Sequence, residues 1–372
     1  MSSALRELVE QTSFTDDREG VSIAQRLFAQ MATELGAAEH VGSPSSRYAH
    51  TLVLHGNIPA SEGGVVLVGH MDTVFPRDVF AGYREEGERA RGPGVLDMKG
   101  GLIVCLWALR AALREQILAR LPWTLVVVAD EEVGSPESTE VLQACASGAR
   151  AALVFESGRA HDRVVTARKG TGSLTVEAFG VAAHAGNAHA QGKNALWALA
   201  RFIDRAQSLT DYDSGITINT GKLSGGTSKN TVPDYARAEL DLRYVHPEQL
   251  PRLRAALAQC AQDNSVEGTR VVLTDGPGRA PLVPTEGSRA LLARYAQCQR
   301  LAGLGDGENP LVGGGSDAST TSAMGVPSLD ALGVRGEGFH TLNEYAELRT
   351  LGPKAEALAR FLAEFSDEMV TP

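Results

Sequence analysis

Short runs of apolar residues alternate with longer helical patterns in the first third of the chain, and this alternation strongly constrains the fold. Apolar runs typical of strands occupy residues 51–54, 65–68, 121–129 and 151–155. Helical patterns occupy residues 2–11, 21–35 and 100–118. A strand that is apolar at every position must be covered on both faces. The pattern therefore predicts an α/β domain whose sheet has helices on both sides.

The pattern changes between about Val165 and Asp275, where the strands alternate apolar and polar residues. The predicted order is strand, helix, strand, strand, helix, strand, at residues 173–178, 195–208, 215–223, 236–244, 247–264 and 269–273. This order is the split βαβ, or ferredoxin-like, motif. The larger pattern resumes after Pro277. We therefore predict a discontinuous domain of residues 1–165 and 277–372 with a second domain, residues 166–276, inserted into it.

Length and charge narrow the class of protein. A chain of 372 residues suits two domains. Its 45 acidic against 35 basic residues give a net charge of -10, which argues against a nucleic-acid partner. No apolar run is long enough for a membrane span, and the first residues lack the features of a secretory signal. The four cysteines are widely separated. We expect a cytoplasmic protein without membrane or nucleic-acid partners.

The apolar run at residues 65–68 leads into His70 and Asp72. At the end of a strand in an open α/β sheet, side chains project into the crevice where ligands bind. Successive side chains of a strand point to opposite faces, so His70 and Asp72, which are two residues apart, lie on the same side. A carboxylate at this spacing can accept the second N–H of a metal-binding histidine and fix its tautomer. A buried histidine beside an incidental acid explains the pair equally well.

Two further acidic segments follow. Asp97 lies among glycines immediately before an apolar helix, either as a helix N-cap or in a loop that a ligand can approach closely. Glu131 and Glu132 follow the apolar run that ends at Ala129. Neighbouring carboxylates at the end of a buried strand raise each other's pKa unless a cation compensates. This favours a metal-facing role for the pair over a solvated loop.

The remaining candidates are Glu156, directly after another apolar strand, and His340, in a turn near the C-terminus. Each residue alone has an ordinary structural explanation. Together, however, histidines and carboxylates gather at strand ends and glycine-rich turns. Nitrogen and oxygen ligands without thiolates suit zinc, cobalt or manganese. The sequence therefore predicts a site for divalent metal.

Three of these segments resemble motifs of the co-catalytic zinc hydrolases. They are GHMDTV at 69–74, GVLDMKGG at 94–101 and DEEVGS at 130–135. That family includes aminoacylases, acetylornithine and succinyl-diaminopimelate deacylases, and carboxypeptidase G-type glutamate carboxypeptidases. The resemblance covers essentially the whole chain. It implies a mixed-sheet zinc-peptidase catalytic domain with an inserted ferredoxin-like lid domain, through which two chains form a homodimer.

The resemblance implies a ligand set for two divalent ions per subunit. Asp97 would bridge the two metals. His70 and Glu156 would complete one site, and Glu132 and His340 the other. Zinc is the metal expected from the family, with cobalt and manganese as alternatives.

It also implies two catalytic roles beside the ligands. Asp72 would orient His70, and Glu131 would be the general base rather than a ligand. The peptide bond after Asp97 is expected to be cis, as in the family.

The inserted domain carries further matches. His184 resembles the family histidine that reaches the partner subunit's active site and helps hold the oxyanion; the alternative is a lid-surface histidine. Asn230 matches a substrate-contacting asparagine. Arg243 and Arg279 lie where the family has arginines near the substrate, although a solvated loop arginine explains Arg279 nearly as well. Gly314 belongs to a glycine loop, residues 313–315, that matches the family's substrate loop.

The implied reaction is amide hydrolysis on a small peptide or an N-acyl amino acid. Water held by two metals attacks the carbonyl, Glu131 takes its proton, and His184 helps to stabilise the oxyanion. Release of a C-terminal amino acid, as in glutamate carboxypeptidases, is the leading interpretation. The alternatives are an N-acyl-amino-acid deacylase and a ureido-acid amidohydrolase. A catalytically silent binding relative is disfavoured because every ligand and the base are present.

Overall fold

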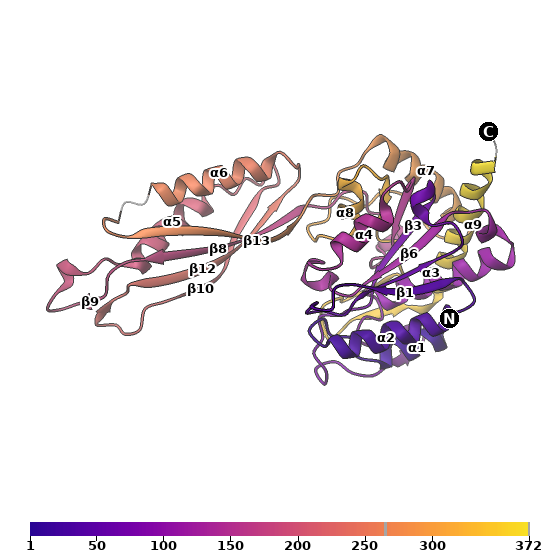
Figure 1. Ribbon diagram of the computed structural model, residues 1–372, viewed down its shortest axis with the longest axis horizontal. Coiled ribbons are helices and arrows are strands. Elements are labelled where there is room, and N and C mark those ends of the chain that lie inside the picture. The colour runs from indigo at the N-terminus through magenta and orange to yellow at the C-terminus, as the bar shows by residue number, and fades with distance from the viewer. Residues whose placement is uncertain (264–265, 371–372) are drawn as a thin grey trace. The chain divides into compact units, whose positions relative to one another are not determined.

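The computed structural model describes residues 1–263 and 266–370 (Figure 1). Two compact units are present. The first comprises Met1–Ala167, Leu282–Val312 and Ser316–Pro372, and the second comprises Arg168–Pro281 with Gly313–Gly315. The expected helix end at Asn264 and the chain end at Pro372 lie outside the described residues. The second unit extends past residue 276 because its last strand continues to Arg279.

A six-stranded sheet forms the centre of the first unit, in the order β1-β2-β6-β3-β7-β14. The strands are β1 (Ala37–Val41), β2 (Thr51–His55), β3 (Val65–His70), β6 (Trp123–Val128), β7 (Ala151–Val154) and β14 (Ser328–Leu329). Strands β6, β3, β7 and β14 are mutually parallel, whereas β2 is antiparallel to β6 and β1 to β2. The sheet is therefore mixed, and its four parallel strands end at one edge.

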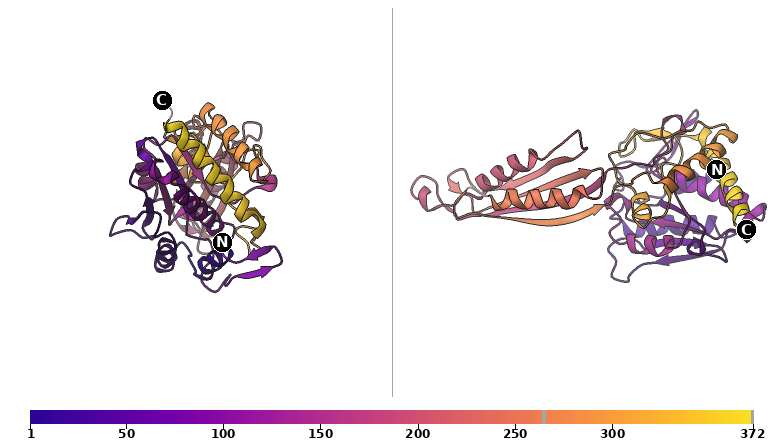
Figure 2. Two further views of the ribbon diagram at one scale, coloured as in Figure 1. Left: turned by 90° about the vertical axis from the view of Figure 1, so that its right-hand side faces the viewer. Right: turned by 90° about the horizontal axis from the view of Figure 1, so that it is seen from above.

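Helices cover both faces of this sheet, which explains why its strands are apolar at every position. Leu67 of β3 faces a core that includes residues of α1 (Ser2–Glu10), α2 (Arg18–Met31), α3 (Lys99–Arg114), α7 (Glu286–Leu301) and α9 (Leu351–Val370). Val66 and Val68 face the other core, with α4 (Thr139–Ala146) and α8 (Ala318–Ala323). Helices α3 and α9 pack against each other (Figure 2). The α/β prediction is confirmed.

A smaller sheet in the same unit has the order β15-β16-β5-β4. Its strands are β4 (Arg84–Glu86), β5 (Arg89–Arg91), β15 (Gly336–Glu337) and β16 (Tyr345–Glu347). β15 and β16 pair antiparallel, so the segment between them folds as a loop. This loop carries His340.

The inserted unit has a four-stranded antiparallel sheet in the order β10-β12-β8-β13. The elements are β8 (Gly170–Phe179), α5 (Ala195–Gln207), β10 (Thr217–Gly225), β12 (Tyr235–Tyr244), α6 (Gln249–Gln262) and β13 (Arg270–Arg279). Alternate residues of β8 are buried, among them Leu174 and Val176, in a core shared with both helices. This is the expected split βαβ motif. A separate ribbon pairs β9 (Ala183–His184) with β11 (Thr231–Val232).

The helix predicted over residues 100–118 is shorter than expected. α3 ends at Arg114, Gln116 adopts a left-handed backbone with φ of 57°, and Ile117–Ala119 form a separate 3-10 turn. A left-handed residue cannot continue a right-handed helix, which explains the break. No helix in the described part of the chain combines the length and apolarity needed to cross a bilayer.

Candidate metal centre

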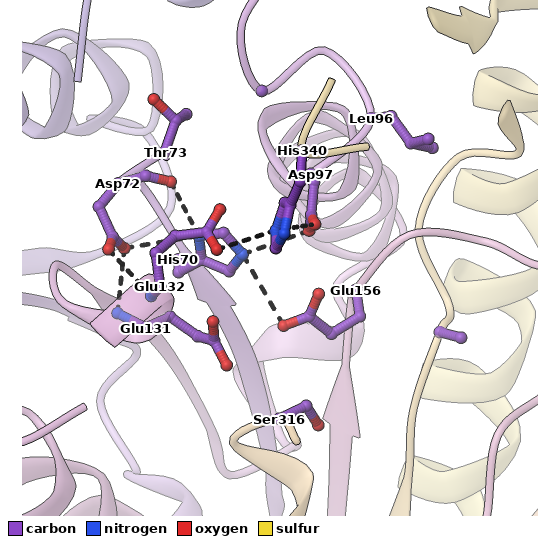
Figure 3. Close-up of polar contacts among 12 residues, drawn as sticks. His70, Asp72, Thr73, Leu96, Asp97, Glu131, Glu132, Glu156, Ser316 and His340 are labelled. Carbon is purple, nitrogen blue, oxygen red and sulfur yellow. Dashed lines mark hydrogen bonds and ion pairs between the residues drawn. The ribbon is translucent and has the colours of Figure 1, made fainter. Parts of the chain in front are cut away.

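The candidate ligands gather at the edge where the parallel strands end. His70 is the last residue of β3, Glu132 lies in the 3-10 turn Glu131–Val133 just after β6, and Glu156 follows β7. Strands β6, β3 and β7 are adjacent and parallel, so their carboxyl ends place these side chains together. Figure 3 shows them converging with Asp97 and His340.

Two groups of three potential ligands share Asp97. In one, His70, Asp97 and Glu156 have donor atoms within 4.8 Å of one another, and in the other Asp97, Glu132 and His340 do. His70 Nε2 lies 3.4 Å from Asp97 Oδ1, and His340 Nε2 lies 3.4 Å from Asp97 Oδ2. The two carboxylate oxygens of Asp97 thus face different histidines, as a bridging ligand requires.

The cluster is strongly anionic, and its members are buried except for the partly buried Glu132 and the exposed His340. Burial and the nearby Asp97 charge raise the pKa of Glu156 well above its usual range. Burial also raises the pKa of Glu132, against the opposing effect of His340. Three carboxylates this close repel one another unless positive charge lies between them.

The histidines respond in the opposite direction. Contacts with Asp97 and Glu132 raise the pKa of His340 to about 10. Burial alone would lower the pKa of His70, but Asp72 and Asp97 raise it well above its usual value. The site therefore favours positive charge at the two histidines.

These residues fit a pair of divalent cations. Asp97 Oδ1 is buried and accepts no hydrogen bond within the described residues, which leaves a lone pair for a ligand. The five side chains offer imidazole nitrogen and carboxylate oxygen and no sulfur, the donor set of zinc hydrolases. Without cations, the carboxylates favour protonated imidazoles. Bound cations would supply that positive charge instead.

Asp72 contacts His70 and also the turn after β6. His70 Nδ1 lies 3.0 Å from the backbone oxygen of Asp72 and 3.5 Å from its carboxylate. The carboxylate accepts the backbone N–H groups of Glu131 and Glu132, each at 3.2 Å, and the Thr15 hydroxyl at 2.9 Å. The backbone oxygen of Asp72 is thus the nearer acceptor for His70. The Asp72 carboxylate instead holds the 3-10 turn Glu131–Val133. Neither this second contact nor the role of Thr15 follows from the sequence pattern.

Glu131 lies beside the cluster without belonging to either group of ligands (Figure 3). Its backbone is held by Asp72 while its neighbour Glu132 reaches His340, with 3.0 Å between Oε2 and Nε2. Adjacent residues in a 3-10 turn point in different directions, so one glutamate can be a ligand while the next is not.

The loop that carries Asp97 is held by a buried carboxylate from the segment after His340. The Asp97–Met98 peptide bond is cis, as expected. Glu344, four residues after His340, is fully buried and accepts three backbone N–H groups from this loop. No spacing rule marks a carboxylate that binds backbone, so Glu344 does not stand out in the sequence.

His184 and Asn230 lie together in the inserted unit. His184 pairs with Thr231 across the β9–β11 ribbon, and Ala185 N–H donates to the Asn230 carbonyl at 2.8 Å. His184 Nδ1 accepts the backbone N–H groups of Gly186 and Asn187, both at 3.1 Å. Because those are donors, Nδ1 carries the lone pair and the proton is on Nε2.

Arg243, Arg279 and Gly314 lie at the other end of the same unit. Arg243 donates to both carboxylate oxygens of Asp241, at 2.8 and 2.9 Å, and to the Gly313 carbonyl at 3.2 Å. The Gly314 carbonyl accepts from Arg168 at 3.2 Å. A Cβ on Gly315 would lie 3.2 Å from Arg279 Cδ, so Arg279 packs against the same glycine loop.

A hollow of about 820 Å³ in the first unit lies away from these residues. It is lined by the end of β2, the end of α3 and Trp123, the first residue of β6. Glu132 comes just after the other end of that strand, where the candidate ligands gather, so this hollow is at the opposite edge of the sheet. The site is defined by its acids and histidines rather than by the volume of a cavity.

Comparisons with known proteins agree with this geometry. A model of peptidase family M20/M25/M40 matches residues 66–364. Carboxypeptidase G2 from a Pseudomonas species is 28% identical over 369 residues, which cover 97% of this chain and 88% of that protein. Acetylornithine deacetylase from Myxococcus xanthus is 29% identical over 344 residues, covering 83% and 84%.

The fold has solved counterparts. A tripeptidase from Staphylococcus aureus superposes with a TM-score of 0.81 at 23% identity, covering 98% of each chain. At that identity the likeness concerns the fold alone.

Proposed function

The chain belongs to peptidase family M20/M25/M40, and on that premise we propose that it is a two-zinc enzyme that hydrolyses an amide bond to release a C-terminal amino acid. Family membership makes it a metal-dependent hydrolase. The observation that carries the proposal is the pair of ligand groups sharing Asp97, with Glu131 beside both and part of neither.

We assign His70, Asp97 and Glu156 to one zinc ion and Asp97, Glu132 and His340 to the other. Cobalt and manganese are accepted by the same donors. When bound, the metal pair supplies Lewis-acid chemistry, polarising the scissile carbonyl and lowering the pKa of water.

We assign the proton transfers to Glu131. Its carboxylate takes a proton from the attacking water and returns it to the leaving amine, as a general base and then a general acid. Asp72 supports both assignments, because its carboxylate holds the backbone of Glu131 and Glu132 in place.

His184 is our candidate for a hydrogen-bond donor to the oxyanion. The tautomer supports this role, since backbone N–H groups occupy Nδ1 and leave Nε2–H to donate. A single donor of this kind is typically worth about 3 kcal/mol in the transition state.

The geometry of the inserted unit favours a homodimer. His184 follows the Phe179 end of β8, whereas Arg243 and Arg279 are paired near its Gly170 end, at Thr171. Ten residues of strand separate the two ends by roughly 30 Å. If both groups act on one small substrate, they must come from different subunits. We therefore propose that His184 and Asn230 serve the partner's site.

Arg279 is the arginine that we assign to the substrate's free carboxylate. Arg243 donates to Asp241 and Gly313, which suits it to holding the glycine loop instead. Arg279 packs against that loop, and a guanidinium can bind a carboxylate through two parallel hydrogen bonds. A small peptide or N-acyl amino acid is thus the proposed substrate, without nucleic-acid or membrane partners.

The four cysteines form no disulfide, which supports a reducing, cytoplasmic location.

A substrate panel tests the proposed reaction. Protein reconstituted with Zn²⁺, Co²⁺ or Mn²⁺ is given acyl-glutamates, other N-acyl amino acids, dipeptides and a ureido acid, and amine release is measured. Cleavage before a C-terminal amino acid is expected, and preference for acidic residues would indicate the glutamate carboxypeptidase type. Cleavage of N-acetyl amino acids alone would indicate a deacylase instead, the activity named for the Myxococcus relative. No turnover with any metal would contradict the proposal.

A further inference from the structure

Glu344 is a fully buried carboxylate next to the metal centre with no ligand role. It belongs to neither ligand group and lies in the loop between β15 and β16 that also carries His340. A buried carboxylate is costly unless donors surround it. The identity of its donors therefore indicates what the residue does.

The donors are three backbone N–H groups of one short loop. Glu344 Oε1 accepts from Leu96 at 2.8 Å and from Asp97 at 3.0 Å, and Oε2 accepts from Gly94 at 3.2 Å. Successive backbone N–H groups that converge in this way form a concave anion site. Here the anion comes from the protein itself, about 250 residues further along the chain.

This arrangement bears directly on Asp97. Its two carboxylate oxygens face different histidines, each at 3.4 Å, so a small rotation of its backbone would favour one side over the other. The N–H of Asp97 is one of the three groups that Glu344 holds.

The His340 loop is also fixed internally. Glu344 N–H donates to the Thr341 carbonyl at 3.1 Å, and the Thr341 hydroxyl donates to the Gly338 carbonyl at 2.7 Å. Glu344 therefore joins the loop of one ligand to the backbone of the shared ligand.

We infer that Glu344 is a positioning residue of the metal centre, which sets the direction of the Asp97 carboxylate relative to His340 by holding the backbone before Asp97. The inference rests on the proposed function, because it assumes that Asp97 and His340 bind metal. Glu344 belongs to neither ligand group, so in this proposal it acts only through the backbone that it holds.

Metal binding by Glu344→Gln tests this role. The amide keeps one acceptor oxygen but turns an NH₂ group toward a backbone N–H, so the loop of residues 94–97 loses part of its hydrogen bonding to residue 344. Metal-stripped protein is titrated with Co²⁺ and followed by calorimetry and by visible absorption. We expect Co²⁺ affinity to fall about 10- to 100-fold, the range seen when supporting contacts of metal ligands are lost. The cobalt absorption bands should shift, and kcat should fall with little change in KM.

Glu347→Gln is the matched control. Glu347 lies three positions further on and is partly buried, but its carboxylate accepts from Arg335 and Arg349 and not from the Asp97 loop. Replacing the Glu347 carboxylate disturbs the segment that follows His340 but not the contacts of residues 94–97. Co²⁺ affinity and absorption should therefore match the wild type. Equal losses in both variants would overturn the inference, as would a Glu344→Gln variant that binds Co²⁺ like the wild type.

Amide hydrogen exchange in the wild-type holoenzyme covers the case in which Glu344→Gln does not fold. The N–H groups of Leu96 and Asp97 should exchange slowly because Glu344 holds them, and rapid exchange would overturn the inference. If the wild type takes up no Co²⁺, the proposed metal function fails instead. The two failures are therefore distinguishable.

Discussion

Glu131 and Glu132 are sequence neighbours with different surroundings. Glu132 Oε2 lies 3.0 Å from His340 Nε2 and belongs to a ligand group, whereas Glu131 belongs to neither group. The 3-10 turn that begins at Glu131 and the two N–H bonds to Asp72 produce this division. One dipeptide would thus supply both the proposed base and a proposed ligand.

This division predicts opposite effects for two matched substitutions. Glu131→Gln should retain both metal ions but lower kcat by about 10²- to 10⁴-fold, the usual contribution of a general base. Glu132→Gln should weaken metal binding as well. Metal content by atomic emission and steady-state kinetics measure both, with Glu140→Gln, on the exposed side of α4, as a neutral control. A Glu131→Gln variant with wild-type kcat would exclude Glu131 as the base.

At the scale of single residues, the sequence indicates the chemistry that each side chain can perform but not the contacts that fix its position. The candidate ligands were recognisable as a set, because histidines and carboxylates gather at strand ends and glycine-rich turns, although each one alone has an ordinary structural explanation. Thr15 and Glu344 were not recognisable, since their contacts join positions 57 to 250 residues apart. Arg243 was expected near the substrate, but only the structure shows that its guanidinium holds Asp241 and Gly313.

At the scale of elements, the start of α3 depends on the absence of a side chain. A Cβ on Gly101 would lie 2.1 Å from the carbonyl oxygen of Phe155, the residue before Glu156. Real Cβ atoms do not approach a carbonyl so closely, so backbone would have to move. Glycine at position 101 therefore lets α3 pack closely against the end of β7, just before Glu156.

Gly101→Ala should therefore destabilise the protein by about 1–3 kcal/mol, the cost typical of overpacking. It should also weaken metal binding by displacing Glu156. The control is Gly352→Ala in α9, where a Cβ would meet nothing within 4 Å. Alanine is the better helix former, so this control should stabilise by up to about 1 kcal/mol. Denaturant unfolding measures both, and equal effects would contradict the packing argument.

Helix α9 carries a buried charge that should make stability depend on pH. Lys354 is fully buried, its ammonium lies 3.6 Å from Asp162 Oδ1, and Arg335 also contacts Asp162. Burial lowers the pKa of Lys354 to about 8, although Asp162 opposes this. The unfolded chain retains a pKa near 10.4. Between these values the unfolded state binds more protons, so this lysine's contribution to stability rises with pH.

Lys354→Met removes that titration. The gain in stability of the variant over the wild type should be largest near pH 7 and should shrink by about 3 kcal/mol as the pH approaches 10.5. Asp162 keeps its contacts with Arg335 and with the Gly305 N–H. Unfolding of both proteins from pH 7 to 10 measures the difference, in which other titrating groups largely cancel. A difference independent of pH would show that Lys354 keeps an ordinary pKa in the folded protein.

The predictability of the elements follows their burial. The strands β2, β3, β6 and β7 were recognised because nearly every residue in them is buried and apolar. The edge strand β1 was missed because all five of its residues are exposed, so no periodic pattern marks it. The hairpin of β4 and β5 was missed for the same reason, as its short strands are mostly charged and exposed.

At the scale of the whole molecule, the inserted unit separates two sets of candidate substrate residues. His184 and Asn230 lie near one end of its sheet, and Arg243, Arg279 and the glycine loop near the other. The order of elements predicted this ferredoxin-like unit. The distance between the two sets, however, follows only from the register in which β8 and β12 pair. That distance makes the dimer a requirement of the proposed mechanism.

Mixing two inactive variants tests whether His184 acts on the partner subunit. Glu131→Gln and His184→Asn should each have low activity alone. After subunit exchange, a mixed dimer contains one site with an intact Glu131 that receives an intact His184 from the other chain. Random pairing of equal amounts should restore about a quarter of wild-type activity, because half of the dimers contain one complete site. If His184 served its own subunit, every site would lack one group and no activity would return.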